Sequence, residues 1–508
     1  MYDYEDEEED IFGTPPAVSS SVPSIDFEKE LNQDQFGAVT APDCPALVLA
    51  GAGSGKTRTL TYRVAYLLSK GVSPEAILLL TFTNKASKQM LSRVEELTGM
   101  ASHRFLGGTF HHVGGQVLRL FGDSISLPRN FTILDDGDSD SLLNEIIRDL
   151  DPDFFKTKEN PKAKPIKGII SFARNIMTDV NQVAKGRYPG NAELLSKIEN
   201  FASLYQKIKL QRGLADYDDL LVYWLEILEN NDEAATYYQN RFSHVLVDEY
   251  QDVNCLQAKI VDKIASKHQI MAVGDDAQCI YTWRGADLDQ ILSFPDRHPG
   301  TKIFKIETNY RSSPEILKLA NDILKSRATE GSFSKELKPS RPHQDLPLVV
   351  PTMDSYQQAD FVLSKVQSLY DSGVHYDDIA ILYRAHFHAM ELQVELSRRG
   401  IPFVITSGMR FFEQAHVKDL VAQLRFVANP KDLTAFFRFA CLLPKVGEKT
   451  AAKIIGIAEK YTLSSQCSLI DALESKEVHA KVPKDAKEDW KELVETLKNI
   501  AILTATAT

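Results

Sequence analysis

The stretch "LVLAGAGSGKTRTL", residues 47–60, constrains the fold more than any other part of the chain. It joins an apolar run to a helical pattern, and Gly51, Gly53 and Gly55 keep the joining loop free of side chains. Backbone N–H groups at the start of the following helix can then wrap phosphate groups. We therefore predict a strand, a loop and a helix that bind a nucleotide, with Lys56 neutralising its β- and γ-phosphates.

A second part of the nucleotide site is expected at "HVLVDEYQD", residues 244–252, where acids follow a buried strand. The hydroxyl of Thr57 is predicted to ligate Mg²⁺, and Asp248 to hold the same ion through water. Glu249 beside it can orient or deprotonate an attacking water. Kinases need no such base, whereas enzymes that hydrolyse ATP to do work need one.

A third stretch, "AVGDDAQCIYTWRGA" (272–286), follows another apolar run. Gln278 is an uncharged polar group suited to sensing a γ-phosphate. Tyr281 and Trp283, followed by Arg284, would form a stacking platform for unpaired bases, although aromatic residues in such a run also serve as core packing.

Two further strand ends carry residues that could grip a nucleic-acid backbone. They are Phe82, Thr83 and Asn84 in "LTFTNKA" (80–86), and Thr109 and His111 in "GTFHH" (108–112).

The pattern along the chain predicts an α/β fold. Continuous apolar runs are typical of parallel strands covered on both faces, and helical patterns separate them. The expected strands are 46–50, 76–80, 244–248 and 270–275, and then "KIFKI" (302–306), "PLVV" (347–350), "IAILY" (379–383) and "PFVI" (402–405). Residues 115–212 and those from about 410 onward are expected to be helical, and 326–345 to be a polar loop.

Bulk properties narrow the class of protein. A chain of 508 residues suggests two to four domains, and no apolar run reaches the length of a membrane span. The five cysteines form no CxxC pair, which favours reduced thiols in a cytoplasmic protein. Residues 1–30 carry a net charge of −9 out of −12, so this tail is predicted to be disordered, as a solubilising leader or a partner-binding segment. The nearly neutral remainder neither supports nor excludes binding of nucleic acid.

Read together, these stretches resemble superfamily 1 DNA helicases of the UvrD/Rep/PcrA group. "LNQDQFGAV" (31–39) resembles that family's glutamine motif, "ADYDDLL" (215–221) its motif Ic and "ETNYRSS" (307–313) its motif IV. The phosphate loop, "LTFTNKAS", "GTFHH", "VDEYQDVN" and "VGDDAQCIYTWRGA" match its motifs I, Ia, Ib, II and III. The resemblance covers nearly everything after residue 30.

The resemblance implies two RecA-like P-loop domains with parallel sheets, the second one incomplete, plus helical insertions. The implied ranges are a tail at 1–30, domain 1A at 31–115 and 212–298, domain 1B at 116–211, the first part of domain 2A at 299–408 and part of domain 2B at 409–508. Such a protein would be a 3′ to 5′ helicase that uses ATP and Mg²⁺ to move along single-stranded DNA and open junctions with duplex. In a bacterium it would work in the cytoplasm at the nucleoid, with repair or replication proteins as partners.

The resemblance also assigns residues. Gln35 would hydrogen-bond the adenine, Tyr310 would lie on its face, and Arg311 would reach the γ-phosphate, joining Lys56, Glu249 and Gln278 as catalytic residues. The implied nucleotide-binding set is Gln35, Gly51, Ala52, Gly53, Ser54, Gly55, Lys56, Thr57, Arg58 and Tyr310. The implied DNA contacts are Phe82, Thr83, Asn84, Thr109, His111, Tyr281, Trp283 and Arg284.

The sequence departs from the family at its C-terminal end, because nothing beyond residue 440 resembles motifs V and VI. The resemblance implies that motif VI would supply a second arginine to the γ-phosphate. A fragment of a longer protein, a truncated reading frame and a remnant that binds ATP and DNA with little turnover all remain open. A subunit of a helicase–nuclease also remains open. A general P-loop kinase or transport ATPase would not need Gln35, the neighbouring Asp248 and Glu249 with Gln251, and Gln278 in this order.

Overall fold

The computed structural model describes residues 25–265, 269–282, 285–327, 333–405 and 415–506. The chain divides into two compact units, of which the smaller is 345–418 and the larger comprises 2–344 and 419–508. None of the described helices combines the length and the apolar character that a membrane span requires.

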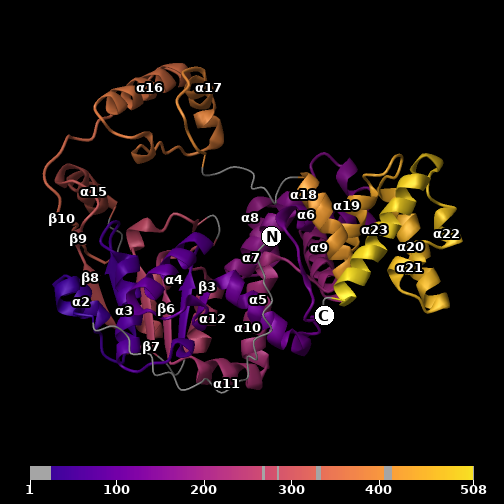
Figure 1. Cartoon of the computed structure of the whole chain (residues 1–508), viewed down its shortest axis with the longest axis horizontal. Helices are drawn as coiled ribbons and strands as arrows, with labels where there is room; N and C mark the ends of the chain where they lie inside the picture. Colours follow the sequence, from indigo (N-terminus) through magenta and orange to yellow (C-terminus); the bar gives the residue numbers. More distant parts are fainter. Residues whose placement is uncertain (1–24, 266–268, 283–284, 328–332, 406–414, 507–508) are drawn as a thin grey trace. The chain divides into compact units, whose positions relative to one another are not determined.

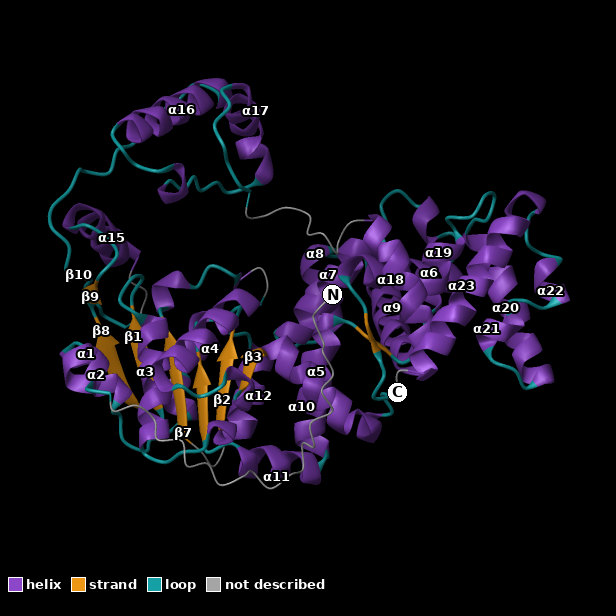
Figure 2. Cartoon of the chain, in the orientation of Figure 1, coloured by secondary structure: helices purple, strands orange, loops and turns teal. Residues whose placement is uncertain are grey.

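The larger unit is built on a six-stranded parallel sheet with the strand order β3-β2-β6-β7-β1-β8 (Figure 2). The strands are β1 (Ala46–Ala50), β2 (Ile77–Thr81), β3 (Leu106–Thr109), β6 (His244–Val247), β7 (Gln269–Gly274) and β8 (Lys302–Ile306). The four expected strands 46–50, 76–80, 244–248 and 270–275 are thereby confirmed to within a residue. The α/β class predicted from the sequence is also confirmed.

Burial on both faces explains why these runs form strands. In β1, Leu47 and Leu49 belong to one hydrophobic cluster, and Val48 and its neighbours Ala46 and Ala50 belong to another. Successive side chains of a strand point to opposite faces, so both faces of β1 are covered. This is the arrangement that a parallel sheet requires.

Helices cover the two faces. One cluster includes residues of α2 (Gln33–Val39), α3 (Lys56–Ser69) and α4 (Asn84–Thr98). The other includes residues of α5 (Phe110–Phe121), α10 (Tyr217–Asn230), α11 (Asp232–Arg241), α12 (Cys255–Ile264), α13 (Leu288–Leu292) and α14 (Phe294–Arg297). The short helix α1 (Phe27–Glu30) precedes them and is labelled in Figure 2, and Figure 1 shows α2 and α3 beside the strands of the sheet.

The strand β8 belongs to the first sheet. The sequence places 302–306 at the start of a second α/β segment, but β8 pairs in parallel with β1, with Phe304 opposite Val48. Without β8, the strand β1 would lie at the edge of the sheet with unpaired backbone N–H and C=O groups, and β8 pairs with that edge. The first sheet therefore extends past the predicted boundary.

Two groups of helices complete the larger unit. The first is α6 (Asp136–Leu150), α7 (Ala163–Asn175), α8 (Val180–Arg187) and α9 (Ala192–Gln211), which share one core and carry the two-residue strands β4 (Thr132–Ile133) and β5 (Leu214–Ala215). The second is α18 (Ala415–Ala428), α19 (Leu433–Ala440), α20 (Glu448–Ser465), α21 (Leu469–Ala472), α22 (Lys476–His479) and α23 (Lys487–Thr506), packed around Phe436 and Trp490. Arg425 of α18 pairs with both Asp432 and Asp138 and so ties the second group to α6.

A short strand pair follows the sheet. β9 (Thr308–Asn309) pairs in parallel with β10 (Lys338–Pro339), and α15 (Pro314–Arg327) lies between them in sequence.

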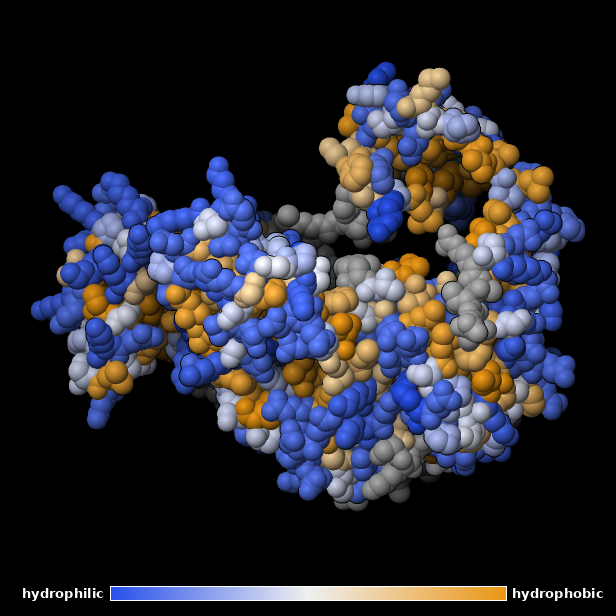
Figure 3. Space-filling model, turned by 180° about the vertical axis from the view of Figure 1, so that it is seen from behind, coloured by the Kyte–Doolittle hydropathy of each residue, from blue (hydrophilic) through white to orange (hydrophobic). Residues whose placement is uncertain are grey.

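The smaller unit contains α16 (Ser355–Asp371) packed against α17 (Met390–Arg398), two short 3-10 helices (Tyr376–Asp378 and His386–Ala389) and the first residues of α18. Residues 345–405 contain no strand, so the strands expected at 347–350, 379–383 and 402–405 are not formed. Val349 and Leu382 are each 96% exposed and Val404 is 89% exposed. Figure 3 shows apolar side chains on the surface of this unit. These runs have the apolar composition of strands, but they have no strand neighbours and no helices that cover them on both faces, which a strand of a parallel sheet requires.

Candidate functional site: a phosphate loop at the carboxyl end of the sheet

The phosphate loop lies between β1 and α3, as predicted. Gly53 and Gly55 have φ angles of 74° and 92°, a left-handed conformation that side-chain-bearing residues rarely adopt. The hydroxyl of Ser54 donates a 2.7 Å hydrogen bond to the carbonyl of Gly51, which closes the loop on itself. The free N–H groups at the start of α3 therefore face the loop, which is the arrangement that binds phosphate.

Lys56 is the first residue of α3 and is 9% exposed. Its amine lies 2.6 Å from a carboxylate oxygen of Glu249 and 3.5 Å from the amide oxygen of Gln278. The three residues predicted to act on the phosphates thus lie together, although they come from three separate strand ends.

The acids after β6 are held in an unusual environment. Burial, with the negative charge of Glu249 as the second cause, raises the pKa of Asp248 to about 7. Burial and the same charge raise the pKa of Asp252 to about 6. Glu249 itself adopts a left-handed backbone conformation with φ of 49°. A non-glycine residue in that region is uncommon and is often found at functional sites.

Gln251 and Asp275 link the ends of β6 and β7. The amide nitrogen of the Gln251 side chain donates to Glu249 over 2.8 Å, and its amide oxygen accepts from the backbone N–H of Asp275 over 2.9 Å. The carboxylate of Asp275 in turn accepts a 2.5 Å hydrogen bond from the side chain of Gln278. This chain of contacts orients Gln278 toward Lys56.

Mg²⁺ fits the oxygen donors at this place. Mg²⁺ is usually bound by one or two protein oxygens together with phosphate oxygens and water. Thr57 stands in the first turn of α3, and Asp248 carries a buried carboxylate whose desolvation a cation would offset. Among the described residues no three His, Cys, Asp or Glu side chains converge as a metal site, so the ion would depend on the nucleotide for its other ligands.

The segment that resembles motif IV lies directly on the phosphate loop. The backbone N–H of Tyr310 donates a 2.9 Å hydrogen bond to the carbonyl of Gly53, and the side chain of Asn309 donates to the carbonyl of Ala52. The Cβ of Arg311 lies 2.6 Å from where a Cβ on Gly53 would be, so a side chain at Gly53 would not fit. Arg311 is exposed beside the loop.

The residues expected around the base are also near the loop. The amide of Gln35 is buried and donates a 3.0 Å hydrogen bond to the carbonyl of Ser54. The hydroxyl of Tyr310 accepts a 2.7 Å hydrogen bond from Asn32, which caps the same helix as Gln35. Arg58 instead pairs with Glu30 over 3.2 Å, so its guanidinium faces the N-terminal helix α1.

The residues expected to contact DNA follow β2, β3 and β7. The rings of Phe82 and Tyr281 stack with centroids 5.3 Å apart and an interplanar angle of 30°. Thr83 and Thr109 act as N-caps, the first for α4, which begins at Asn84, and the second for α5. His111 meets Tyr217 edge to face, with centroids 5.9 Å apart. Trp283 and Arg284 lie outside the described residues.

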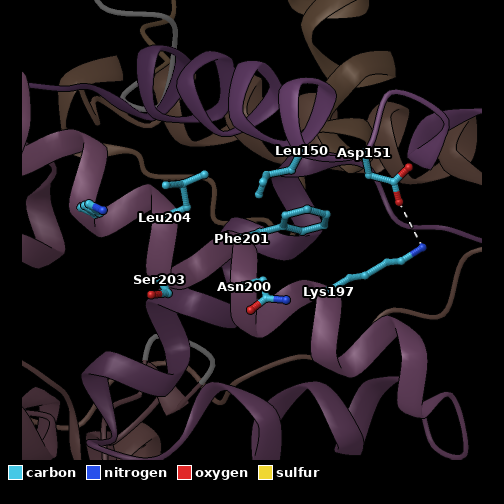
Figure 4. Close-up of a pocket in the computed structure, with 8 residues that line it drawn as sticks. Leu150, Asp151, Lys197, Asn200, Phe201, Ser203 and Leu204 are labelled. Carbon is cyan, nitrogen blue, oxygen red and sulfur yellow. Dashed lines mark ion pairs between the residues drawn. The ribbon is translucent and has the colours of Figure 1, made fainter.

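A pocket of about 480 Å³ lies elsewhere, on the helical group α6 to α9 (Figure 4). Its lining residues include Leu150, Asn200 and Phe201, and a 3.0 Å ion pair joins Asp151 to Lys197 at its rim. None of the predicted site residues lines it.

Comparison with known proteins decides the family. A family model described as the UvrD/REP helicase N-terminal domain matches residues 31–299, which is more than half of the chain. The chain belongs to the UvrD/REP helicase family. A second model, the UvrD-like helicase C-terminal domain, matches residues 304–502. The resemblance stated from the motifs is thereby confirmed.

Curated relatives extend the match. The chain is 34% identical to the ATP-dependent DNA helicase PcrA of Staphylococcus epidermidis over 449 residues, which cover 88% of the chain and 60% of that protein. It is 34% identical over 450 residues to the PcrA of Staphylococcus aureus strain Mu50, covering 87% of the chain and 59% of that protein. The chain therefore spans about 60% of the length of the curated relatives that it matches.

The residue assignments made from the sequence missed three residues at this candidate site. Asn309 and Leu337 contact the phosphate loop, and Lys335 pairs with two acids beside Gln278. Asn309 stands inside a recognisable motif, which is a signal that could have found it. Lys335 and Leu337 stand in a segment that reads only as a polar loop.

Proposed function

We propose that this chain is the ATP-binding and DNA-binding part of a 3′ to 5′ DNA helicase, an enzyme that couples ATP hydrolysis to movement along single-stranded DNA. The observation that carries the proposal is that Lys56, Glu249 and Gln278 lie together at one end of the sheet. Residues 309–311 contact the phosphate loop at the same end. The substrates are ATP, with Mg²⁺, and single-stranded DNA or its junction with duplex. The pathway would be repair or replication, in the cytoplasm at the nucleoid of a bacterium.

Each group has a task in hydrolysis. The N–H groups at the start of α3 and the amine of Lys56 would bind the phosphates, with Thr57 and Asp248 as the residues for Mg²⁺, which neutralises phosphate charge when bound. Glu249 would accept the proton of the attacking water, because its carboxylate stands beside Lys56 and therefore beside the terminal phosphate. Gln278 and Arg311 would stabilise charge on the γ-phosphate, and Gln35 and Tyr310 would hold the adenine.

DNA would lie along the carboxyl ends of β2, β3 and β7. The stacked pair Phe82 and Tyr281 offers a flat aromatic surface to bases, and Tyr281 is three residues from Gln278 along the chain. Movement of Gln278 with the state of the nucleotide would therefore move part of the DNA surface. Asn84, Thr83, Thr109, His111, Trp283 and Arg284 complete the proposed contacts.

The domain ranges predicted from the sequence remain our proposal, with one change. We propose that domain 1A includes β8 and so extends to residue 306, which moves the start of the first part of domain 2A from residue 299 to residue 307. Domain 1B at 116–211 and the part of domain 2B at 409–508 keep their predicted ranges.

A weaker activity is favoured by one observation. Residues 345–405, in the region proposed as domain 2A, contain no strand. A second lobe without a sheet could not close firmly on the nucleotide, and the chain would then bind ATP and single-stranded DNA with little turnover. A fragment of a helicase–nuclease subunit would give the same site.

The test is ATP hydrolysis by residues 1–508, with and without single-stranded DNA, beside a Glu249→Gln variant. The motor function predicts turnover that rises with DNA and falls by at least about a hundredfold in the variant. Tight binding of both ligands without turnover would favour the passive binder, and failure to bind ATP would contradict both.

A further inference from the structure

Lys335 is a buried cation that belongs to none of the motifs. It lies in the polar segment 326–345, and only 7% of its side chain is exposed. Its amine pairs with the carboxylates of Asp275 and Asp276, which are themselves 5% and 7% exposed. Lysine is almost never buried unless it is paired, so the position of Lys335 depends on these two acids.

The two acids belong to the turn that carries Gln278. Asp275 accepts a 3.1 Å hydrogen bond from the backbone N–H of Ala277 and a 2.5 Å hydrogen bond from the side chain of Gln278. Two neighbouring carboxylates that are both buried repel each other unless a cation compensates them. The amine of Lys335 is the cation that contacts both.

The segment around Lys335 is anchored at the phosphate loop. The side chain of Leu337 comes within 2.2 Å of where a Cβ on Gly51 would lie. The backbone of Leu337 exchanges two 3.0 Å hydrogen bonds with the side chain of Asn321 on α15. Residues 338–339 pair with β9, which lies inside the segment that resembles motif IV. One short segment therefore contacts both the phosphate loop and the turn of Gln278.

The amine of Lys335 contacts two carboxylates of the Gln278 turn, and the phosphate loop contributes no residue to these ion pairs. The Gln278 side chain, by contrast, lies between Asp275 on one side and Lys56 on the other, at 2.5 Å and 3.5 Å. Loss of the compensating cation would push Asp275 and Asp276 apart and shift Gln278 away from Lys56.

We propose that Lys335 is a positioning residue for ATP turnover: by compensating Asp275 and Asp276 it holds the 275–278 turn so that Gln278 stays beside Lys56. The inference rests on the proposed ATP hydrolysis for its effect on rate. The predicted effect of Lys335 on the geometry of the turn does not depend on ATP hydrolysis, and the two effects can be measured separately.

The test compares Lys335→Met with the double variant Lys335→Met/Asp276→Asn. Methionine keeps the length of the side chain but removes the charge, so the single variant should lower kcat for ATP by about tenfold to a hundredfold, as expected when a catalytic group is displaced by about 1 Å. The KM for ATP should change by less than about threefold, because the phosphate loop is intact. The double variant returns the cluster to its original net charge and should recover most of kcat, and Lys335→Arg should recover part of it.

Lys325→Met is the matched control. Lys325 stands ten residues away at the end of α15 and pairs with Glu336 over 3.4 Å, but its side chain is 65% exposed. An exposed pair contributes little, so this variant should leave kcat and stability unchanged.

Amide hydrogen exchange in residues 269–282 provides a readout that does not need turnover. Exchange should be faster in Lys335→Met and return toward that of the unmodified protein in the double variant. If the unmodified protein hydrolyses no ATP and exchange still responds in this way, the proposed function fails while the positioning role stands. Unchanged exchange in Lys335→Met, or a loss of kcat that the double variant does not recover, would overturn the inference.

Discussion

Residues 77–81, "ILLLT", and residues 379–383, "IAILY", are similar apolar runs with opposite outcomes. The first is β2, a strand between β3 and β6 in which Leu79 is fully buried. The second forms no strand, and its Leu382 is 96% exposed. The difference lies in the surroundings, because a strand of a parallel sheet needs hydrogen-bonding neighbours at its edges and helices over both faces.

The comparison extends to function. The polar residues of the proposed nucleotide site follow β1, β6 and β7, whose ends are fixed by the sheet. A site placed on such rigid elements keeps its geometry better than one placed on extended segments. In the described part of the chain, the residues of the proposed site therefore all lie in the larger unit, which contains the sheet.

The largest expected effect compares one substitution in the two regions. Leu79→Ala should lower the free energy of unfolding by about 2–5 kcal/mol, because it leaves a cavity inside the sheet. Leu382→Ala should change it by less than about 0.5 kcal/mol, because the side chain already meets water. Denaturant unfolding followed by tryptophan fluorescence, to which Trp224 in the core beside the sheet contributes, measures both free energies. Similar losses in both variants would contradict the comparison.

The next effect compares two stacked aromatic pairs. Phe82→Ala removes one face of the pair with Tyr281 and should weaken binding of single-stranded DNA by about 1–3 kcal/mol. Tyr370 and Tyr376 in the smaller unit also stack, with centroids 4.2 Å apart, and serve as the control. Tyr370→Ala should leave DNA affinity unchanged in a fluorescence anisotropy titration with a labelled oligonucleotide. Equal weakening by the two variants would remove the assignment of the DNA surface.

The smallest effect concerns Asp248, which follows β6 at the carboxyl end of the sheet. The pKa of Asp248 is raised to about 7 in the folded protein, so the fold favours its protonated form. Its contribution to stability is complete below about pH 4 and is lost as the pH rises through about 7. Asp248→Asn should therefore stabilise the nucleotide-free protein at pH 8, by on the order of 1–2 kcal/mol, and much less at pH 5.

Thermal unfolding at the two pH values measures this effect. Asp345→Asn is the control, because Asp345 is an exposed acid at the start of the smaller unit. If Asp248→Asn stabilises the protein equally at pH 5 and pH 8, titration of Asp248 is not the cause.

Much of this sheet and site could be predicted from the sequence alone. Five of the expected apolar runs form strands of the first sheet, although 302–306 was expected in a second one, and the spacing of glycines before Lys56 predicts the phosphate loop. Local patterns suffice there because each run is short, continuous and flanked by residues of clear preference. The α/β class and the family follow from the same residues.

The remaining features depend on contacts between distant residues. No local pattern in the sequence predicts that β8 joins the first sheet next to β1, or that residues 379–383 lack a neighbouring strand. Lys335 and Asp275 are 60 residues apart, and a lysine in a polar loop normally indicates a solvated surface. The predicted contacts with DNA, including those of Trp283 and Arg284, stay predictions.

The central claim is that one nucleotide site is assembled from the phosphate loop, the ends of β6 and β7, and residues 309–311. Amide hydrogen exchange of the Glu249→Gln variant with and without ATP and Mg²⁺ tests it most directly, because this variant should bind the nucleotide without consuming it. The account predicts slower exchange in 51–58, 248–252, 275–278 and 309–311 together, at one ATP concentration, and no change in 347–350 or 379–383. Protection confined to the phosphate loop, or no protection by ATP at all, would contradict the claim.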